Sequence, residues 1–480
     1  MMRKDASRAA RLPRASAIAA CLSAIFAAAC AVGPDYRPPE LPSEAARPFA
    51  GADPDYFVDG EAPGEWWRLY DDDALDAAIR EALEANTDLR AAAANLARAA
   101  AVLREARGGR LPSTTLDASS TSGEQRFVQL QQSISFEDTV YDAGFDVAYQ
   151  VDLFGRVRRA VEAARADAAA AEAVYHAAQI TVAAETARAW ASACATRLEL
   201  AAAQRNLELQ QESLALTERL LEAGRGTALD VARAAAAVER TRASIPELEA
   251  AHIGALYRLA VLMGRAPTDY PAAAAECAQP PRVAQAIPVG DGAALLSRRP
   301  DVREAERRLA AATARIGVAT ADLYPSVRFV GSAGAVALSA GDLDSGDSSR
   351  WSLGPVLSWT FPNRSIVRAR LAQARADADA ALAAFDGAWL DALREVESAL
   401  TSYAKERERV EALTNARRHA SDAARLAHAR FDAGQVSFLD VLQAEAALAE
   451  AEIALARAQG RAADLEISLF LALGGGWGPR

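Results

Sequence analysis

The residues that could support catalysis are few and lie far apart in the sequence. The chain has 480 residues and four histidines, and no two histidines have the spacing of a metal-binding motif on a helix. His419 and His428, for example, are nine residues apart and fall on different faces of a helix. No phosphate-binding loop, nucleophile elbow or paired-cysteine metal motif is present. We therefore expect no enzymatic activity and no cofactor, and interpret the histidines as ordinary helix-surface residues: His176, His252, His419 and His428.

Two aspartates stand at related positions, each three residues after a hydroxyl side chain. Thr227 precedes Asp230, Ser437 precedes Asp440, and both aspartates lie in a Leu-Asp-Val sequence. This spacing is typical of a capping box, in which the acid accepts hydrogen bonds from free backbone amides at the start of a helix. A negative charge at that end also interacts favourably with the helix dipole. The sequence therefore predicts that both aspartates cap helices.

The first 29 residues have the composition of an export signal. Five basic side chains and one acid are followed by an apolar stretch over residues 15–29, which ends in three alanines. Cys30 follows directly, in a pattern that resembles the lipobox of bacterial lipoproteins, although the usual leucine three places earlier is Ala27. Cys21 has a better local match, but the apolar segment before it is too short. We expect removal of residues 1–29 and lipid attachment at Cys30; the alternative is an ordinary signal peptide cleaved nearby.

The other two cysteines, Cys194 and Cys277, leave two alternatives open. In the oxidising compartment that an exported protein reaches, they could form a disulfide. Both lie among alanines, however, and this favours two small, unbonded hydrophobic side chains in the interior.

The composition disfavours two classes of protein. Removal of residues 1–29 would change the net charge from −11 to −15, and so acidic a surface disfavours nucleic acid as a partner. The rest of the chain has no apolar run of about 20 residues, so we expect no transmembrane helix. Its alanine-rich helices each bury little apolar area, and self-association is therefore expected.

The elements that must position the two aspartates begin with a very long helix. Residues 156–223 contain no glycine or proline and consist largely of strong helix formers. At about 1.5 Å per residue this helix would extend roughly 100 Å, far beyond the diameter of a compact domain. Gly224 ends it and a second helical run over residues 227–263 follows. The sequence thus predicts a helical hairpin with Asp230 near its tip.

The segment before the long helix has a different period. Residues 143–151 alternate strictly between one apolar and one polar face, which predicts a strand. We predict a weaker strand over residues 113–122 and a polar loop over residues 123–139. Residues 66–107 have apolar side chains near helical spacing, and we expect one helix there.

The chain then repeats this pattern at a spacing of 210 to 213 residues. Asp88 and Pro112 match Asp301 and Pro325 in the second half, and the two Leu-Asp-Val sequences also match each other. In the second half we accordingly expect strands over residues 326–338 and 351–361, a polar loop over 339–350 and a long helix over 363–433. The predicted organisation is a signal peptide (1–29), a lipid-anchored extended N-terminal strap (30–65), a first repeat (66–264), an inter-repeat linker (265–300), a second repeat (301–474) and a C-terminal tail (475–480).

Four strands with one apolar face and a rim of aromatic residues are typical of a membrane β-barrel. Four strands cannot close a barrel, because the smallest has about eight. Open sheet edges in lipid would leave backbone groups unpaired, so the chain must combine with copies of itself. Two copies would supply 8 strands and three would supply 12. The alternative is a small soluble sheet at the end of a coiled coil.

Several motifs resemble those of the outer-membrane channels of bacterial tripartite efflux systems, the lipidated NodT/OprM-like branch of the TolC-like superfamily. The resemblance covers essentially the whole chain after the signal. Its motifs are Cys30 followed by residues 33–36 (GPDY), Trp66-Trp67, residues 151–156 (VDLFGR), 299–303 (RPDVR), 323–326 (LYPS) and 472–477 (ALGGGW). It implies a homotrimer with a 12-stranded barrel in outer-membrane lipid, continuous with a helical tunnel in the periplasm. It also implies a periplasmic adaptor and an inner-membrane transporter of the RND type as partners.

The same resemblance assigns roles to the hairpin tips. In such channels the tips close the periplasmic end, and a ring of carboxylates concentrates cations. Asp440 would form an acidic ring and Asp230 would hold neighbouring hairpins together, with helix capping as the alternative role. Many relatives have another acid three positions after Asp440, but this chain has Gln443. Tip residues that we consider as adaptor contacts, or as merely solvated residues, are Gly224, Arg225, Gly434 and Gln435.

We therefore expect a passive outer-membrane exit duct for small toxic molecules or drugs, driven by the inner-membrane transporter. One alternative is the outer-membrane channel of a type I protein secretion system. Another, of a different class, is a lipid-anchored periplasmic coiled-coil scaffold.

Overall fold

The protein is described by a computed structural model that covers residues 31–40, 43–129, 132–361 and 364–475. The predicted signal peptide, Cys30 and residues 476–480 of the predicted tail lie outside the described residues. The chain forms two compact units, each described by itself below. The first contains the described residues up to Pro39 with Ala97–Ala170 and Ala305–Ala384, and the second contains Glu40–Leu96, Ala171–Glu304 and the described residues from Phe385 onward.

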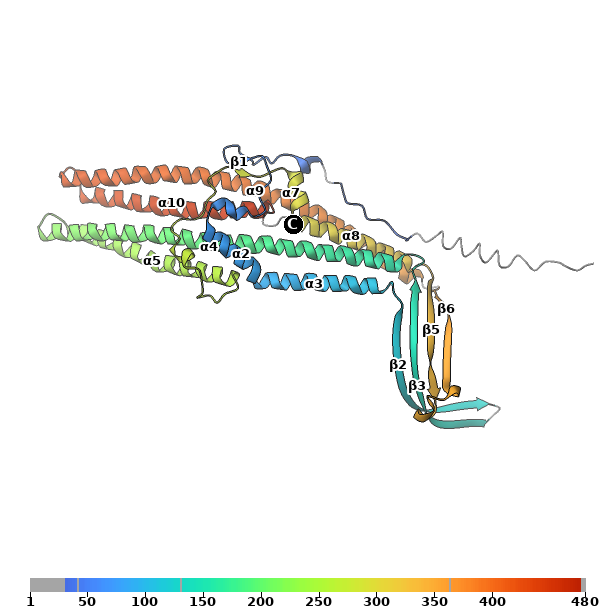
Figure 1. Ribbon diagram of the computed structural model, residues 1–480. Helices are drawn as coiled ribbons and strands as arrows, with labels where there is room; N and C mark the ends of the chain where they lie inside the picture. The colour runs from blue at the N-terminus through green and yellow to red at the C-terminus, as the bar shows by residue number, and fades with distance from the viewer. Residues whose placement is uncertain (1–30, 41–42, 130–131, 362–363, 476–480) are drawn as a thin grey trace, which may run out of the picture. The chain divides into compact units, whose positions relative to one another are not determined.

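The first unit contains a four-stranded antiparallel sheet with the strand order β2-β3-β5-β6 (Figure 1). The strands are β2 (Ser113–Gln129), β3 (Gln132–Val151), β5 (Ser326–Ala337) and β6 (Ser349–Ser358). The alternation over residues 143–151 predicted β3 correctly. Among the described strands, β2 and β6 each have one neighbour only and form the two edges of this sheet.

The polar loop predicted over residues 123–139 is wrong. β2 and β3 continue through it and pair as far as Gln129 and Gln132. Most residues of this segment are polar, but backbone hydrogen bonds between two antiparallel strands do not require an apolar face. In the second half the loop ends at Ser348 and contains two short 3-10 turns, η3 (Ala340–Asp342) and η4 (Gly346–Ser348). β6 begins two residues earlier than predicted and ends at Ser358.

The sheet has one apolar and one polar face. Leu116, Phe145, Ala333 and Trp351 align across the four strands, and Leu353 lies two residues further along β6 on the same face. Leu116, Trp351 and Leu353 are about four-fifths exposed in the single chain. The opposite face has polar residues such as Asp142 and Arg350, whose side chains are 2.5 Å apart. The exposed apolar face therefore needs a partner other than water.

Two helical hairpins extend from the chain segments that follow each strand pair. The first consists of α4 (Arg156–Glu222, 67 residues) and α5 (Ala228–Leu262), and the second of α9 (Arg364–Asp432, 69 residues) and α10 (Phe438–Ala472). α4, α5 and α9 confirm the predicted runs to within two residues at each end, apart from Asn363, which lies outside the described residues. α10 is the counterpart of α5 in the second repeat. Gly387 does not interrupt α9.

In the second unit α4 and α10 are neighbours. Arg188 of α4 donates a hydrogen bond of 2.6 Å to Asp464 of α10, and Arg457 of α10 donates one of 3.1 Å to Glu199 of α4. The helices approach so closely that a Cβ at Gly460 would lie 2.7 Å from the Ala195 Cβ. α5 contacts α4 and α9 contacts α10, and residues of α4, α5 and α10 also line one common cavity.

The single helix predicted over residues 66–107 is wrong, because it consists of three elements. These are η2 (Trp66–Tyr70), α2 (Asp73–Ala85) and α3 (Thr87–Gly108). Asn86 separates α2 from α3; its side chain accepts hydrogen bonds from the Asp88 and Leu89 amides and donates one of 2.9 Å to the Leu262 carbonyl. It thus caps α3 and satisfies a carbonyl at the end of α5.

The second half has the same break at the equivalent position. Arg299, 213 residues after Asn86, separates α7 (Gly292–Arg298) from α8 (Pro300–Ala321). Its Nη1 donates a hydrogen bond of 2.9 Å to the Ala472 carbonyl at the end of α10. In the first half Asn86 therefore connects the start of α3 to the end of α5, and in the second half Arg299 connects the start of α8 to the end of α10.

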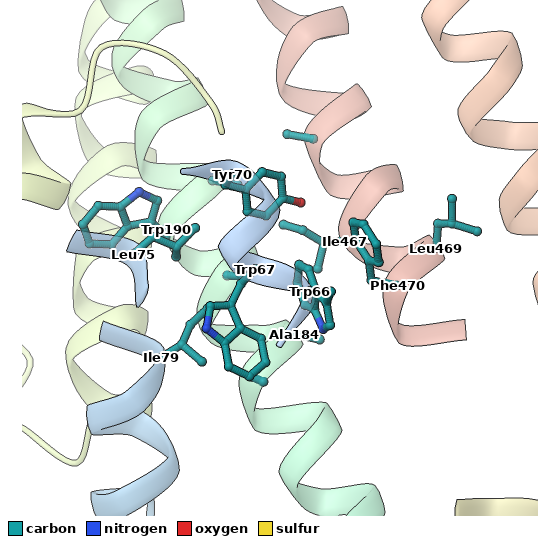
Figure 2. Packing of buried hydrophobic residues seen from close by; sticks show 14 of the residues in the cluster. Trp66, Trp67, Tyr70, Leu75, Ile79, Ala184, Trp190, Ile467, Leu469 and Phe470 are labelled. Atoms are coloured by element: carbon teal, nitrogen blue, oxygen red, sulfur yellow. The ribbon is translucent and has the colours of Figure 1, made fainter. Parts of the chain in front are cut away.

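The main hydrophobic core lies in the second unit around η2. Trp66 and Trp67 are almost fully buried, and Trp66 stacks on Phe470 of α10 with 4.8 Å between ring centroids (Figure 2). Trp190 of α4 and Ile79 of α2 belong to the same cluster. This short aromatic turn therefore holds α2, α4 and α10 together.

Residues 40–65 and the inter-repeat linker contain short regular elements, which the sequence did not predict. β1 (Phe57–Val58) pairs in parallel with β4 (Ile287–Pro288). The linker also contains α6 (Ala272–Glu276), and the N-terminal part contains η1 (Ser43–Ala46). The Ala50 and Gly51 amides each donate a hydrogen bond of 2.8 Å to Glu397 of α9. These long-range contacts compensate for the weak local propensity of both segments.

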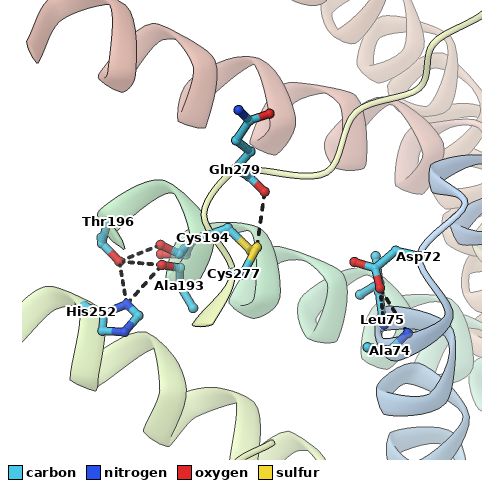
Figure 3. The surroundings of a disulfide bond; sticks show 10 residues. Asp72, Ala74, Leu75, Ala193, Cys194, Thr196, His252, Cys277 and Gln279 are labelled. Atoms are coloured by element: carbon cyan, nitrogen blue, oxygen red, sulfur yellow. Dashed lines mark hydrogen bonds between the residues drawn. A yellow bond between two sulfur atoms is a disulfide. The ribbon is translucent and has the colours of Figure 1, made fainter. Parts of the chain in front are cut away.

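Cys194 and Cys277 form a disulfide (Figure 3). The favoured interpretation as two unbonded hydrophobic side chains is therefore wrong. Cys194 is fully buried in α4, and Cys277 follows α6 in the linker. The alanines around Cys194 allow the linker to approach α4 closely enough for the bond to form.

Candidate functional site

The tips of the two hairpins have the same backbone geometry. Gly224 and Gly434 have φ values of +70° and +69°, in the left-handed region that glycine adopts without strain. The amides of Arg225 and Gln435 donate hydrogen bonds of 2.8 Å to carbonyls five residues earlier, which ends α4 and α9. The four tip residues proposed as adaptor contacts are all exposed.

Among the described residues a backbone amide donates to the carboxylate of Asp440 but not to that of Asp230, so the predicted capping role is confirmed for Asp440 alone, and at the first tip Thr227 caps the return helix. The Ser437 amide and hydroxyl donate hydrogen bonds of 2.9 and 2.6 Å to Asp440 Oδ2. At the first tip the Thr227 hydroxyl donates to Asp230 Oδ2 at 2.6 Å, and the Asp230 amide donates to Thr227 Oγ1 at 3.3 Å. The hydrogen bonds from Ser437 hold the pKa of Asp440 below its usual value, so this exposed carboxylate is charged at neutral pH.

The second tip differs from the first in an aromatic pair that the sequence analysis missed. Phe431 of α9 and Phe438 of α10 pack edge to face with 5.3 Å between ring centroids. The equivalent residues of the first hairpin are Leu221 and Ala228. Only the second tip, which has Asp440, is thus closed by two aromatic rings. A comparison of the two tips at the repeat spacing of 210 residues would have shown that aromatic residues occupy these two positions in the second tip only.

One histidine contradicts its prediction as a surface residue. His252 of α5 is 8% exposed, and its Nδ1 lies 3.0 Å from the Ala193 carbonyl of α4. The small side chain of Ala193 leaves room for the imidazole. His428 remains partly exposed on α9, and its Nε2 lies 2.8 Å from Glu445 Oε1 of α10. Within the described ranges, no three histidine, cysteine or acidic side chains are grouped to hold a metal ion.

The structure brings three of the sequence motifs together in the first unit. Arg159 of α4 donates a hydrogen bond of 2.7 Å to Asp35 of the N-terminal strap and also contacts the Val32 and Gly33 carbonyls. A Cβ at Gly33 would lie 2.5 Å from the Gly317 Cα of α8, so only glycine fits there. The start of the described strap is therefore fixed to α4 and α8.

A stacked ring pair joins the other two of these motifs. Phe154 and Tyr324, which precede α4 and β5, have ring centroids 4.6 Å apart. Asp152 caps α4 by accepting hydrogen bonds of 2.9 and 2.8 Å from the amides of Val157 and Arg158. These motifs therefore fix the joints between the sheet and the long helices.

Among the residues that the structure describes, no helix is both long and apolar enough to cross a membrane.

Comparison with known protein families shows to which family a chain with this sheet and these long helical hairpins belongs. A family model described as "Outer membrane efflux protein" matches residues 78–265 and 293–475. The chain belongs to this family.

Individual relatives are similar to this chain over nearly its whole length. It is 32% identical over 470 residues to the outer membrane protein OprJ of Pseudomonas aeruginosa, covering 96% of each chain. The solved structure of the outer-membrane channel OprN has a TM-score of 0.88 and 38% identity, with 94% of this chain and 100% of that chain covered. The MtrE outer membrane channel of Neisseria gonorrhoeae, solved in its open state, has a TM-score of 0.80 and 28% identity, with 93% and 98% covered.

The family resemblance drawn from the sequence motifs is therefore confirmed. The protein is an outer-membrane exit duct for efflux that extends into the periplasm. Its relatives are channels, in agreement with the expected non-enzymatic role.

Proposed function

We propose that three copies of the chain assemble into one duct with a 12-stranded barrel in the outer membrane. The observation that carries this proposal is the sheet with two open edges and an exposed apolar face. Its four strands alternate in direction, so β6 of one copy can pair with β2 of the next in antiparallel fashion. The apolar face would then contact lipid and the polar face, with Asp142 and Arg350, would line the lumen.

Exposed apolar side chains on two helices of the second unit support the same assembly. Ile253, Tyr257 and Val261 follow each other at a spacing of four on α5 and are 42%, 39% and 52% exposed. On α9, Leu390 is also exposed. In a ring of three copies this apolar stripe of α5 would pack against α9 of the next copy, and the helices would form a continuous tunnel wall.

We further propose that the duct works with a periplasmic adaptor and an inner-membrane transporter of the RND type. The names of relatives support this, since the chain is 31% identical to a toluene efflux pump outer membrane protein, TtgC of Pseudomonas putida. Energy would come from the transporter, and small toxic molecules or drugs would be the cargo. Cys30 would anchor each copy to outer-membrane lipid, and the exposed tips with Gly224, Arg225, Gly434 and Gln435 would contact the adaptor. The repeats would be bounded at residues 66–264 and 301–474.

Membrane fractionation tests this assembly against a lipid-anchored periplasmic scaffold. We expect the protein in the outer-membrane fraction as a trimer that dissociates only on heating in detergent. The matched control is the Cys30→Ala variant, which loses the lipid but keeps the sheet and should still be extracted only by detergent. A soluble monomer from this variant would contradict the barrel. Export of a protein substrate through the duct would instead favour the type I secretion alternative.

For the periplasmic end we propose that Asp440, once per chain, forms an acidic ring that favours cations, and that Asp230 links neighbouring hairpins. The exposure of the Asp440 carboxylate, its ionised state and its place beside the Phe431–Phe438 pair support this role. Capping and gating are compatible, because Ser437 contacts only Oδ2 and leaves Oδ1 free of the capping bonds.

An Asp440→Asn variant is expected to reduce the cation preference of the duct in planar bilayers by severalfold. The amide oxygen can still accept the capping hydrogen bonds, so only the charge is lost. The matched control is Ser437→Ala, which removes a capping hydroxyl and costs about 1 kcal/mol of helix stability but keeps the charge. Unchanged selectivity of an intact Asp440→Asn trimer would show that Asp440 only caps α10.

A further inference from the structure

Arginines are concentrated where two helices of the first unit meet the edge strands of the sheet. Residues 104–110, at the end of α3, lead into β2, and residues 364–375, at the start of α9, follow β6. These two segments contain seven arginines and a single acid, Glu105. The chain as a whole has a net charge of −11. The positive charge beside the sheet is therefore a local feature that runs against the overall composition.

The seven arginines are all exposed, and within the described ranges none of them forms an ion pair. By contrast, Arg315 of α8 in the same unit pairs with Asp167 of α4. On α9, Arg364, Arg368 and Arg375 follow each other at spacings of four and seven residues, so they share one face of the helix. We call the seven residues the basic patch: Arg104, Arg107, Arg110, Arg364, Arg368, Arg370 and Arg375. Its charges are free to bind an anionic ligand.

Aromatic residues lie at the same end of the sheet. Tyr149 of β3 and Phe329 of β5 are paired on the apolar face, and Trp359 directly follows β6. The three side chains are 39% to 48% exposed. Partly exposed aromatic rings at one end of an apolar strand face are typical of the boundary between membrane lipid and water. The arginines of α9 begin a few residues beyond this boundary.

The N-terminal strap reaches the same level by a separate route. A Cβ at Gly155 would lie 2.6 Å from the Ala31 Cβ, so Ala31 packs on the turn that precedes α4. A Cβ at Gly109 would lie 3.6 Å from Val157 Cγ1, so the end of α3 is adjacent to the start of α4. Ala31 follows Cys30, the proposed site of lipid attachment, and an acyl chain there would enter the membrane beside this turn. The strap and the aromatic residues thus indicate the same membrane level, next to the basic patch.

We propose that the basic patch binds the anionic headgroups of phospholipids in the membrane leaflet on the periplasmic side. Guanidinium groups donate paired hydrogen bonds to phosphate oxygens, and an anionic lipid surface attracts clusters of arginine. The inference rests on the proposed barrel, because the sheet must lie in lipid for α3 and α9 to meet headgroups.

The proposed ring of three copies makes an anionic ligand necessary at the patch. Pairing of β6 with β2 of the next copy would bring the arginines of α9 to the arginines of the next copy's α3. Like charges at a contact between copies repel each other unless anions lie between them. Bound headgroups would therefore anchor the duct and also stabilise the contact between copies.

Electron paramagnetic resonance with spin-labelled lipids tests this site in the full-length protein, reconstituted in phosphatidylcholine vesicles. The spectrum separates lipid in contact with protein from bulk lipid and gives the association constant of spin-labelled phosphatidylglycerol relative to phosphatidylcholine. We expect a severalfold preference for phosphatidylglycerol, which falls as sodium chloride screens the arginines. The triple variant Arg364→Gln, Arg368→Gln and Arg375→Gln should lose much of this preference. The matched control replaces three exposed arginines of the second unit by glutamine and should keep it: Arg205, Arg240 and Arg418.

The outcomes separate the lipid site from the barrel on which it rests. Equal association of both lipids with the inserted wild type would overturn the lipid site and leave the barrel intact, whereas no protein-contacting lipid of either kind would contradict both. The site is also overturned if the triple variant keeps the wild-type preference. If that variant fails to insert, a wild-type preference that does not depend on salt overturns the site. A stronger effect of sodium phosphate than of sodium chloride at equal ionic strength would identify free phosphate as the ligand in place of lipid.

Discussion

Replacement of both Cys194 and Cys277 by alanine is expected to lower the free energy of unfolding by about 4.5 kcal/mol in the chain-entropy model. The reason is the sequence separation of 83 residues, because the bond closes a large loop and restricts the unfolded chain. The size of the loss in free energy depends on the number of residues in the closed loop. The position of the bond determines which contact is lost in the folded protein. The linker that contains Cys277 should lose its covalent attachment to α4.

Chemical unfolding of the detergent-solubilised protein measures this loss. Each single alanine variant should be destabilised about as much as the double variant, since either one breaks the bond. Treatment of the wild type with a reducing agent provides the matched control and should reproduce the shift without any substitution. If reduction and the double substitution both left the unfolding midpoint unchanged, the disulfide would not contribute to stability.

Truncation of Trp66 to alanine is the other substitution with a large expected effect, a loss of about 3–5 kcal/mol. Trp66 is completely buried, stacks on Phe470 and packs beside Trp67, so its removal leaves a cavity where η2, α4 and α10 meet. Trp66→Phe should cost less, because the ring stacked on Phe470 is retained.

The same unfolding experiment with Trp389→Ala is the control. Trp389 lies on α9 outside this core and is partly exposed, so its loss should cost much less. Equal destabilisation by Trp66→Ala and Trp389→Ala would show that the aromatic turn does not organise the core.

The long helices and the alternating strand could be predicted because their signals are local. The run over residues 156–223 lacks helix breakers, and residues 143–151 alternate over nine positions. The break at Asn86 could not be predicted, because it depends on a hydrogen bond to Leu262, 176 residues away. The outer part of the β2–β3 hairpin was predicted as a loop because most of its residues are polar, although Ile134 and Phe136 do alternate with polar neighbours.

In the candidate sites, too, features that depend on local sequence were predicted and features that depend on long-range contacts were not. The capping role of Asp440 follows from a spacing of three residues and was predicted, whereas at the first tip Thr227 caps the helix instead of Asp230. The hydrogen bonds from Tyr403 and the Val283 amide to Glu466, a buried acid of α10, were not predicted, because the three residues come from distant parts of the chain. The disulfide was missed for a related reason, since only the path of the linker brings Cys277 to Cys194.

Recording from the purified wild-type protein in planar lipid bilayers tests the central claim, a passive outer-membrane duct, most directly. We expect stable ion conductance from the trimer without any nucleotide, with a preference for cations. An Asp440→Asn trimer should conduct as well, with a weaker preference. Bilayers that contain inserted trimers of both proteins and yet remain non-conducting would contradict the duct.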